Sequence, residues 1–328
     1  MRKGRWLFLL LASGIAHAAS FDCAKALTAP EKAICSVPEL SVADERLSAS
    51  YKASIEGLLP DTIQALRSDE SEWLHYVARV CEAGKKQPTK SLARCMLEPF
   101  QARNELLPKS RNRHGQTLFV MRTRFVTMPP SKNWSDKTSG TYNLQTFIWP
   151  YADSDAPEWK NWNAAVERAV MAEIGLPASD AAGEVTADVE YLGQARVTAS
   201  IREQHIYEGF PHLYIHSEKF HWLLKENREM KVEDMFKPGI EWVKAVYDCC
   251  AVEGIKGHTY NDGDRDGAFA RTLFEEFVKK PRNWDIGSGG LTFEFTEGAL
   301  GEASDPEPLT VPWMTLQPFL QANFAIPK

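Results

Sequence analysis

The chain has 328 residues, of which 44% are hydrophobic, and a formal net charge of −6 at pH 7. This composition is typical of a globular protein, and the length is sufficient for two domains. The acidic balance disfavours binding to nucleic acid or to an anionic membrane surface and favours a cationic partner.

The first eighteen residues have the pattern of an export signal. Three Arg and Lys residues precede a short apolar run at 6–15, and Ala-His-Ala follows at 16–18. The run is too short to span a bilayer, and a small-x-small tripeptide marks a cleavage site. We therefore expect residues 1–18 to be a cleaved signal peptide and the mature protein to be periplasmic, without a membrane anchor. Because the signal carries three positive charges and no acidic residue, its removal changes the net charge from −6 to −9.

The six cysteines divide into four before residue 100 and an adjacent pair at 249–250. Four cysteines allow three pairings, and the short loops favour Cys23–Cys35 and Cys81–Cys95. A zinc site is the competing interpretation, but the spacings lack Cys-x-x-Cys and the expected compartment is oxidising. We expect four structural cysteines in two disulfides. The pair at 249–250 could form an adjacent disulfide, stay reduced or pair with another chain.

Residues 19–108 have the pattern of a small helical domain. Thr28 followed by Glu31 forms a capping box at the start of a short helix between the first two cysteines. Three longer helices follow, and a core of this size is one that disulfides supplement. Their apolar positions recur every three or four residues. These positions are Leu47, Tyr51, Ile55 and Leu58; Ile63, Leu66, Trp73, Val77 and Val80; and Leu92, Met96, Phe100 and Leu106.

The same segment carries a more specific pattern. It combines Phe21-Asp-Cys-Ala-Lys-Ala, Glu31-Lys-Ala-Ile-Cys and Trp73-Leu with the four spaced cysteines. Over about residues 20–107 this pattern resembles the N-terminal domain of the LprI-type lysozyme-inhibitor family. The resemblance implies a secreted, cysteine-stapled helical domain in a family named for a member that inhibits lysozyme.

From residue 109 to 328 the pattern changes to mixed strands and helices. The residues Val185, Ala187, Val189 and Tyr191 alternate, and after a turn at Gly193 the alternation continues to residue 201, which predicts a hairpin with one dry face. The mixture predicts an α+β fold with an antiparallel sheet. The other predicted strands are 118–126, 142–149, 220–224, 291–295 and 309–313, and the predicted helices are 159–174, 241–250 and 267–279.

A second resemblance covers about residues 117–322. Gly209-Phe-Pro-His, Met230-Lys-Val-Glu-Asp-Met-Phe and Leu291-Thr-Phe-Glu-Phe are similar to motifs of the RsiV-type extracytoplasmic domain. That family has small residues before the histidine and a proline after it, whereas this chain has Phe210-Pro211 before it and no proline after it. Because RsiV is a lysozyme receptor, this resemblance implies the same ligand as the first.

Two groups of residues raise the question of a metal. His205, His212, His216 and His221 lie within a short stretch, but zinc requires three convergent ligands, and hairpin histidines explain the group equally well. The segment 262–267 begins like a calcium loop, but Leu occupies the twelfth position, where a bidentate Glu is needed. We expect a solvated acidic turn there, and we expect no metal and no other cofactor.

Signatures of catalysis are missing from the sequence. It contains no Gly-x-Ser-x-Gly, His-Glu-x-x-His or Cys-x-x-Cys motif, so we expect a protein that is not an enzyme. The two resemblances and the acidic balance lead to the hypothesis of a protein that binds and inhibits a cationic c-type lysozyme. A turn containing Tyr207, Glu208, Phe210 and His212 is the predicted contact, with 285–308 as a candidate acidic rim.

Two other classes of function stay open. One is a cell-wall sensor or carbohydrate-binding module, which would bind peptidoglycan by stacking Trp134, Trp149 or Trp159 on sugar rings. The other is a metal-dependent hydrolase that uses the histidine group.

Overall fold

The chain folds into two compact units. The first comprises residues up to Glu56 together with 77–110, and the second comprises 57–76 together with the chain from Arg111 onward. The predicted boundary near residue 108 and the predicted signal peptide stay predictions. The protein is represented by a computed structural model that describes residues 19–82, 88–128, 143–172, 181–207, 213–251, 268–295 and 308–327.

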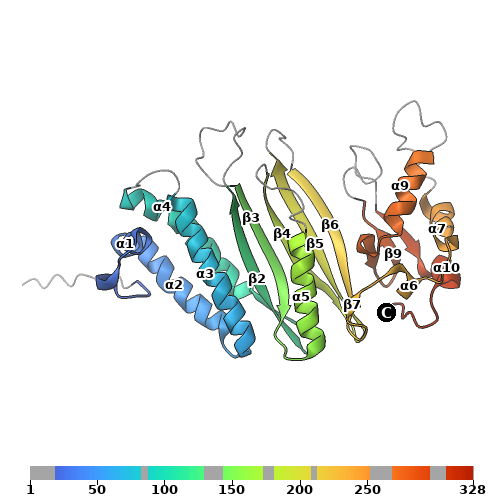
Figure 1. The fold of residues 1–328 in the computed structure, drawn as a ribbon, viewed down its shortest axis with the longest axis horizontal. Helices are drawn as coiled ribbons and strands as arrows, with labels where there is room; N and C mark the ends of the chain where they lie inside the picture. The colour runs from blue at the N-terminus through green and yellow to red at the C-terminus, as the bar shows by residue number, and fades with distance from the viewer. Residues whose placement is uncertain are drawn as a thin grey trace, which may run out of the picture. The chain divides into compact units, whose positions relative to one another are not determined.

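The first unit is a small helical bundle with the three predicted longer helices (Figure 1). Helix α3 belongs to both units, since its residues up to Tyr76 pack with the second. Apolar side chains from α1, α2 and α4 form the core, including Ile34, Leu40 and Phe100. The elements are η1 (Cys23–Lys25), α1 (Ala29–Ser36), α2 (Pro38–Ile55), α3 (Pro60–Glu82), α4 (Thr89–Leu106) and η2 (Leu107–Lys109).

A seven-stranded sheet, with strands in chain order, forms the centre of the second unit. Neighbouring strands are antiparallel except β3 and β4, which run parallel. The helix α5 (Pro157–Ala172) connects these two strands, because a parallel pair needs a crossover connection. The strands are β1 (Arg111–His114), β2 (Thr117–Met128), β3 (Asn143–Ala152), β4 (Ala181–Leu192), β5 (Arg196–Tyr207), β6 (Leu213–Leu223) and β7 (Arg228–Glu229).

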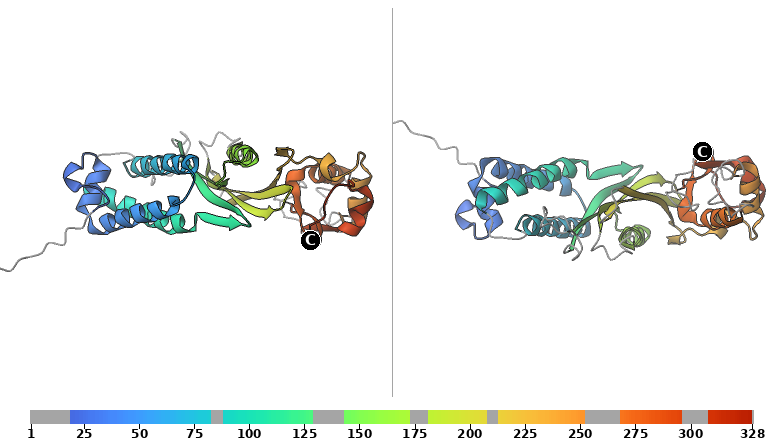
Figure 2. Two further views of the ribbon diagram at one scale, coloured as in Figure 1. Left: turned by 90° about the horizontal axis from the view of Figure 1, so that it is seen from below. Right: turned by 90° about the horizontal axis from the view of Figure 1, so that it is seen from above.

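Helix α5 covers one face of this sheet (Figure 1, Figure 2). Its Trp162 and Val166 are fully buried in a core that contains the predicted dry face of the hairpin. The register between β4 and β5 shifts at Val189 and Tyr191. The alternation of buried and exposed side chains therefore ends at this point. Tyr191 is 37% exposed, whereas the sequence pattern predicted it on the buried face of the hairpin.

The N-terminal part of α3 packs along β2. Asp69 is 3% exposed and accepts hydrogen bonds from Arg122 Nε at 2.5 Å and Arg122 Nη2 at 2.7 Å. It also accepts the backbone N–H of Thr123 at 3.3 Å, and Tyr76 stacks on Phe125 with ring centroids 5.0 Å apart. β1 pairs with β2 only as far as Val120. Beyond that point Asp69 of the helix accepts the backbone N–H of Thr123 in place of a neighbouring strand.

The C-terminal part of the second unit has its own core around a three-stranded sheet in the order β10-β9-β8. Phe236 stacks on Trp242 at 4.1 Å, and both rings meet Trp284 edge to face. The predicted helix at 241–250 ends as a π-helical turn. The elements are α6 (Val232–Met235), α7 (Glu241–Val246), η4 (Tyr247–Ala251), α9 (Ala268–Val278), η5 (Pro281–Asn283), β8 (Trp284–Ile286), β9 (Gly290–Phe293), β10 (Leu309–Pro312), α10 (Trp313–Leu316) and η6 (Gln317–Phe319).

Polar contacts join this part to the large sheet. His221 on β6 contacts the backbone carbonyl of Trp284, with Nε2 and O 2.9 Å apart. Arg282 bonds Glu218 at 2.6 Å and Glu229 at 2.7 Å. These contacts fix η5 and β8 against β6 and β7. The α+β fold predicted from the sequence is confirmed.

Candidate functional site

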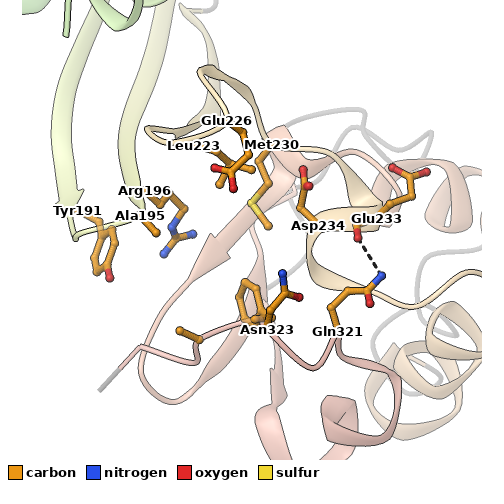
Figure 3. Close-up of a pocket in the computed structure, with 12 residues that line it drawn as sticks. Tyr191, Ala195, Arg196, Leu223, Glu226, Met230, Glu233, Asp234, Gln321 and Asn323 are labelled. Carbon is orange, nitrogen blue, oxygen red and sulfur yellow. Dashed lines mark hydrogen bonds between the residues drawn. The ribbon is translucent and has the colours of Figure 1, made fainter. Parts of the chain in front are cut away.

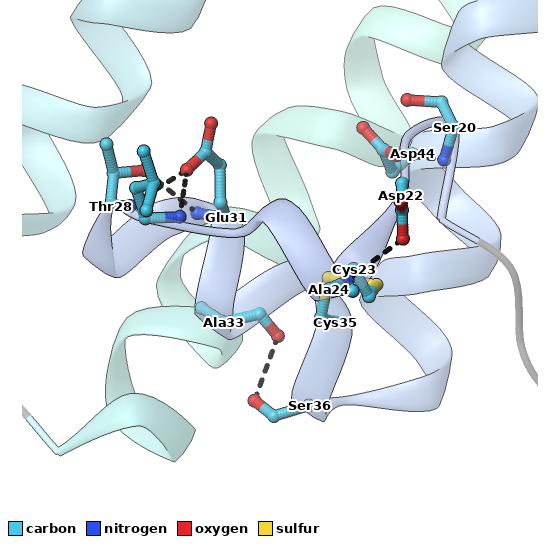
Figure 4. The surroundings of a disulfide bond; sticks show 11 residues. Ser20, Asp22, Cys23, Ala24, Thr28, Glu31, Ala33, Cys35, Ser36 and Asp44 are labelled. Carbon is cyan, nitrogen blue, oxygen red and sulfur yellow. Dashed lines mark hydrogen bonds between the residues drawn. A yellow bond between two sulfur atoms is a disulfide. The ribbon is translucent and has the colours of Figure 1, made fainter.

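The N-terminal segment of the helical unit is held by its own polar contacts (Figure 4). Thr28 Oγ1 accepts the Glu31 N–H at 3.3 Å, and Glu31 Oε2 accepts the Thr28 and Leu27 N–H groups, each at 2.8 Å. This is the predicted capping box. The backbone N–H groups of Thr28 and Leu27 lower the pKa of Glu31, because they stabilise its charged form.

Two disulfides close this unit, and they are the predicted pairs. Cys23 bonds Cys35 and Cys81 bonds Cys95, with Cα–Cα distances of 5.7 Å in both. Paired thiols cannot bind zinc, so the competing interpretation of these four cysteines is wrong. Structural disulfides are typical of proteins outside the cytoplasm. Cys249 is disulfide-bonded too, so the alternative in which it stays reduced is also wrong.

A groove of about 710 Å³ runs between α2 and α4 of this unit. The small side chains of Ala43, Ala49 and Ser50 are part of its lining. Asn104 crosses it, donating to the Ala43 carbonyl at 2.9 Å and accepting from Ser50 Oγ at 3.3 Å. Glu39, Arg46 and Glu105 line the groove with charges of both signs. It can therefore hold a polar surface of a partner without a strong preference for charge.

The predicted contact lies at the connection between β5 and β6, which is the turn end of this hairpin. Tyr207 is the last residue of β5, whereas Glu208, Phe210 and His212 lie outside the described residues. Exposed aliphatic side chains flank this turn. Ile206 and Leu213 are paired across the two strands and are 52% and 46% exposed.

The opposite face of this hairpin end carries two of the predicted histidines. His205 Nε2 lies 2.7 Å from Glu203 Oε1, and both side chains are more than 90% buried. Across the strands, His216 faces Glu203 and Tyr214 faces His205. Tyr214 and His216, two residues apart on β6, therefore lie on the same face as His205 and Glu203. A carboxylate beside an imidazole is an arrangement that proton transfer uses, but burial keeps this pair away from an outside group.

His221, an odd number of residues further along β6, lies on the other face of the sheet and has a different environment. It is 2% exposed, with Nδ1 2.9 Å from Thr198 Oγ1 and Nε2 2.9 Å from the Trp284 carbonyl. Burial, then the charge of Arg196, lowers its pKa from 6.5 to about 3. The described residues contain no cluster of three His, Cys, Asp or Glu side chains able to hold a metal. His212 and the acidic turn at 262–267 lie outside that set.

Of the tryptophans proposed for stacking on sugars, the structure describes two, one of which is buried and the other half-buried. Trp149 is 1% exposed in the core under α5. Trp159 packs edge to face on Phe119 at 5.5 Å and on Trp162 at 5.8 Å. Trp134 and residues 296–307 of the candidate acidic rim are outside the described residues. Where the structure describes the chain, no helix combines the length and apolar character of a membrane span.

The chain was compared with curated proteins, with solved structures and with protein-family models. No curated protein matches the chain. The chain is similar to a crystal structure of a DUF3298 family member from Bacteroides fragilis NCTC 9343, with 12% identity, a TM-score of 0.42, and coverage of 65% of this chain and 96% of that one. It is also similar to a DUF3298 family protein from Pseudomonas aeruginosa PAO1, with 15% identity, a TM-score of 0.44, and coverage of 64% and 97%.

Because both TM-scores are below 0.5, neither structure informs the fold or function of this chain. The family match ends before the second unit's sheet, so the resemblance of residues 117–322 to the RsiV type stays a prediction. Residues 23–107, in contrast, match the family model described as "Lysozyme inhibitor LprI", which confirms the first resemblance found in the sequence.

Proposed function

We propose that this protein is exported to the periplasm, where it binds and inhibits a c-type lysozyme and catalyses no reaction itself. The observation that carries the proposal is the family match of residues 23–107. The two disulfides support it, because they suit a protein that works in an oxidising compartment.

Charge supports the same partner. The chain has a net charge of −6, and loss of the proposed signal peptide would make it −9. A c-type lysozyme is strongly basic, so the two proteins attract each other at long range and associate faster at low salt. Inhibition then requires that part of the protein fill the cleft in which two carboxylates act on the substrate.

The contact that we propose is the turn with Tyr207, Glu208, Phe210 and His212. It joins two long strands of the sheet, which give it a rigid base. Exposed Ile206 and Leu213 beside it offer an apolar surface, the kind that forms the desolvated centre of an interface.

The test is lysozyme hydrolysis of a soluble oligosaccharide with increasing amounts of mature protein. A soluble substrate separates binding of the enzyme from shielding of the cell wall. We expect Ile206→Asp to weaken inhibition by about tenfold or more, because it puts a charge at the centre of the contact. Ile240→Asp is the matched control, since Ile240 is also exposed, at 67%. Absence of inhibition by the wild type at micromolar protein would refute the proposal.

A further variant distinguishes the two units. Ala49→Arg places a bulky side chain in the groove between α2 and α4, inside the family-matched segment. We expect it to inhibit as the wild type does. If Ala49→Arg abolished inhibition while Ile206→Asp preserved it, the groove would be the contact and the proposed hairpin contact would be wrong.

A further inference from the structure

A pocket of about 410 Å³ lies in the second unit, away from the hairpin end (Figure 3). The turn between β4 and β5, the segment from β6 to α6 and the C-terminal segment enclose it. This volume falls in the range of small-molecule sites. Its lining residues are Tyr191, Ala195, Arg196, Leu223, Glu226, Met230, Glu233, Asp234, Gln321, Asn323, Phe324 and Ala325.

Arg196 is the unusual member of this lining. It is 8% exposed, and its Nη1 is buried without a hydrogen-bond partner. Its guanidinium lies over the Tyr191 ring, 4.6 Å from the centroid, and Figure 3 shows it directed toward the C-terminal segment. Burial lowers its pKa, and the neighbouring Tyr191 and Asp285 oppose that shift only in part. A buried cation without a paired anion is costly, so its presence indicates an anionic ligand.

Two half-buried arginines of this unit, in contrast, have carboxylate partners. Arg122 is paired with Asp69. Arg228 donates to both carboxylate oxygens of Asp234, at 2.7 and 2.6 Å. The one aspartate of the pocket lining is therefore already paired. Arg196 is therefore the cation of the lining that a ligand carboxylate could pair with through two parallel hydrogen bonds.

The remaining charges of the lining are negative. Glu226 and Glu233 are exposed, and no ion pair between described residues engages either of them. Figure 3 shows Arg196 and Glu233 on different sides of the space, with the side chains of Leu223 and Met230 between them. Glu226 lies beside Leu223, on the Arg196 side of the space, whereas the carboxylate of Glu233 is directed away from the other lining side chains. A ligand that is only anionic would be repelled by these glutamates, whereas a zwitterion would satisfy both ends.

We propose that this pocket binds a short peptide in zwitterionic form, with its terminal carboxylate on Arg196 and its ammonium group at Glu226. The apolar wall of Leu223, Met230 and Phe324 would receive a peptide side chain. The site is independent of lysozyme binding, which is proposed for the hairpin end.

The test is calorimetric titration of the full mature chain with alanyl-alanine, leucyl-leucine and alanyl-phenylalanine. The best binder is then compared with its C-terminal amide and its N-acetyl form. We expect each blocked peptide to bind about tenfold more weakly or worse, because each loses one charge-assisted contact. If no dipeptide binds at millimolar concentration, or if acid and amide bind equally, the proposal is wrong.

Two variants connect this result to the residues. Arg196→Met should remove the preference for the acid over the amide, and Arg202→Met is the matched control, because Arg202 is exposed on the same strand. Should Arg196→Met fail to fold, the comparison of acid and amide on the wild type decides. A preference for the acid that persists in Arg196→Met would contradict the assignment to Arg196.

Discussion

Acidification should destabilise the second unit through His221. The Trp284 carbonyl can only accept a hydrogen bond, so His221 Nε2 carries the proton and Nδ1 accepts from the Thr198 hydroxyl. The neutral ring is therefore fully satisfied where it is buried. A second proton would place a charge in this site, next to Arg196, and these are the causes that lower the pKa to about 3.

The loss of stability in acid follows from the difference between the pKa of His221 in the folded and in the unfolded chain. Between pH 6.5 and about 3 the unfolded chain holds a proton on His221 that the folded chain does not. Stability contributed by this site is complete above pH 6.5 and decreases as the pH falls. From pH 7.5 to 4.5 the loss in the free energy of unfolding amounts to about 2.5 kcal/mol.

The assay is urea unfolding, followed by tryptophan fluorescence, of the wild type and of His221→Gln at several pH values. Glutamine can keep a donor and an acceptor but does not titrate, so the variant should lose less stability on acidification. Burial raises the pKa of Glu184 and of Asp188, which favours the folded state in acid, but it does so equally in both proteins. If the difference between the two proteins stays constant from pH 7.5 to 4.5, the reasoning on His221 is wrong.

Three further predictions concern stability. Asp69→Asn leaves the charge of Arg122 buried and should lower the free energy of unfolding by about 3–5 kcal/mol in chemical unfolding. Asp61→Asn, at a side chain that is 75% exposed, should lower it by less than about 1 kcal/mol. Equal losses in the two variants would refute the role of burial. Gly290→Ala would put a Cβ 2.3 Å from a backbone oxygen and should cost about 1–3 kcal/mol, while Gly289→Ala meets no atom and should be nearly neutral. Replacing both cysteines of the first disulfide by serine should lower the stability of the helical unit by about 3 kcal/mol, and an unchanged unfolding midpoint would contradict this.

The helical unit was predictable from the sequence because its signals are local. The capping box at Thr28 and the apolar repeats need only neighbouring residues, and the confirmed helices follow them. The short loops favoured the right cysteine pairs for the same reason. Strands as short as β1 and β8 carry too few residues to show alternation, and they were missed.

Pairing between distant segments was not predictable. The parallel contact of β3 with β4 depends on how α5 crosses the sheet, which no local pattern states. The shift at Tyr191 likewise appears only when β4 meets β5, and it places that ring beside Arg196. The burial of Trp149 has the same cause, since α5 covers its face. The pocket around Arg196 was therefore not predictable from the sequence.

The central claim, binding to a lysozyme cleft, is tested most directly by calorimetric titration of mature protein into a c-type lysozyme. The titration is repeated after an N-acetylglucosamine oligosaccharide has filled the cleft. We predict a complex with one inhibitor per enzyme, weakened by the oligosaccharide and by added salt. Absence of heat at micromolar concentrations, or binding that the oligosaccharide does not affect, would contradict this account.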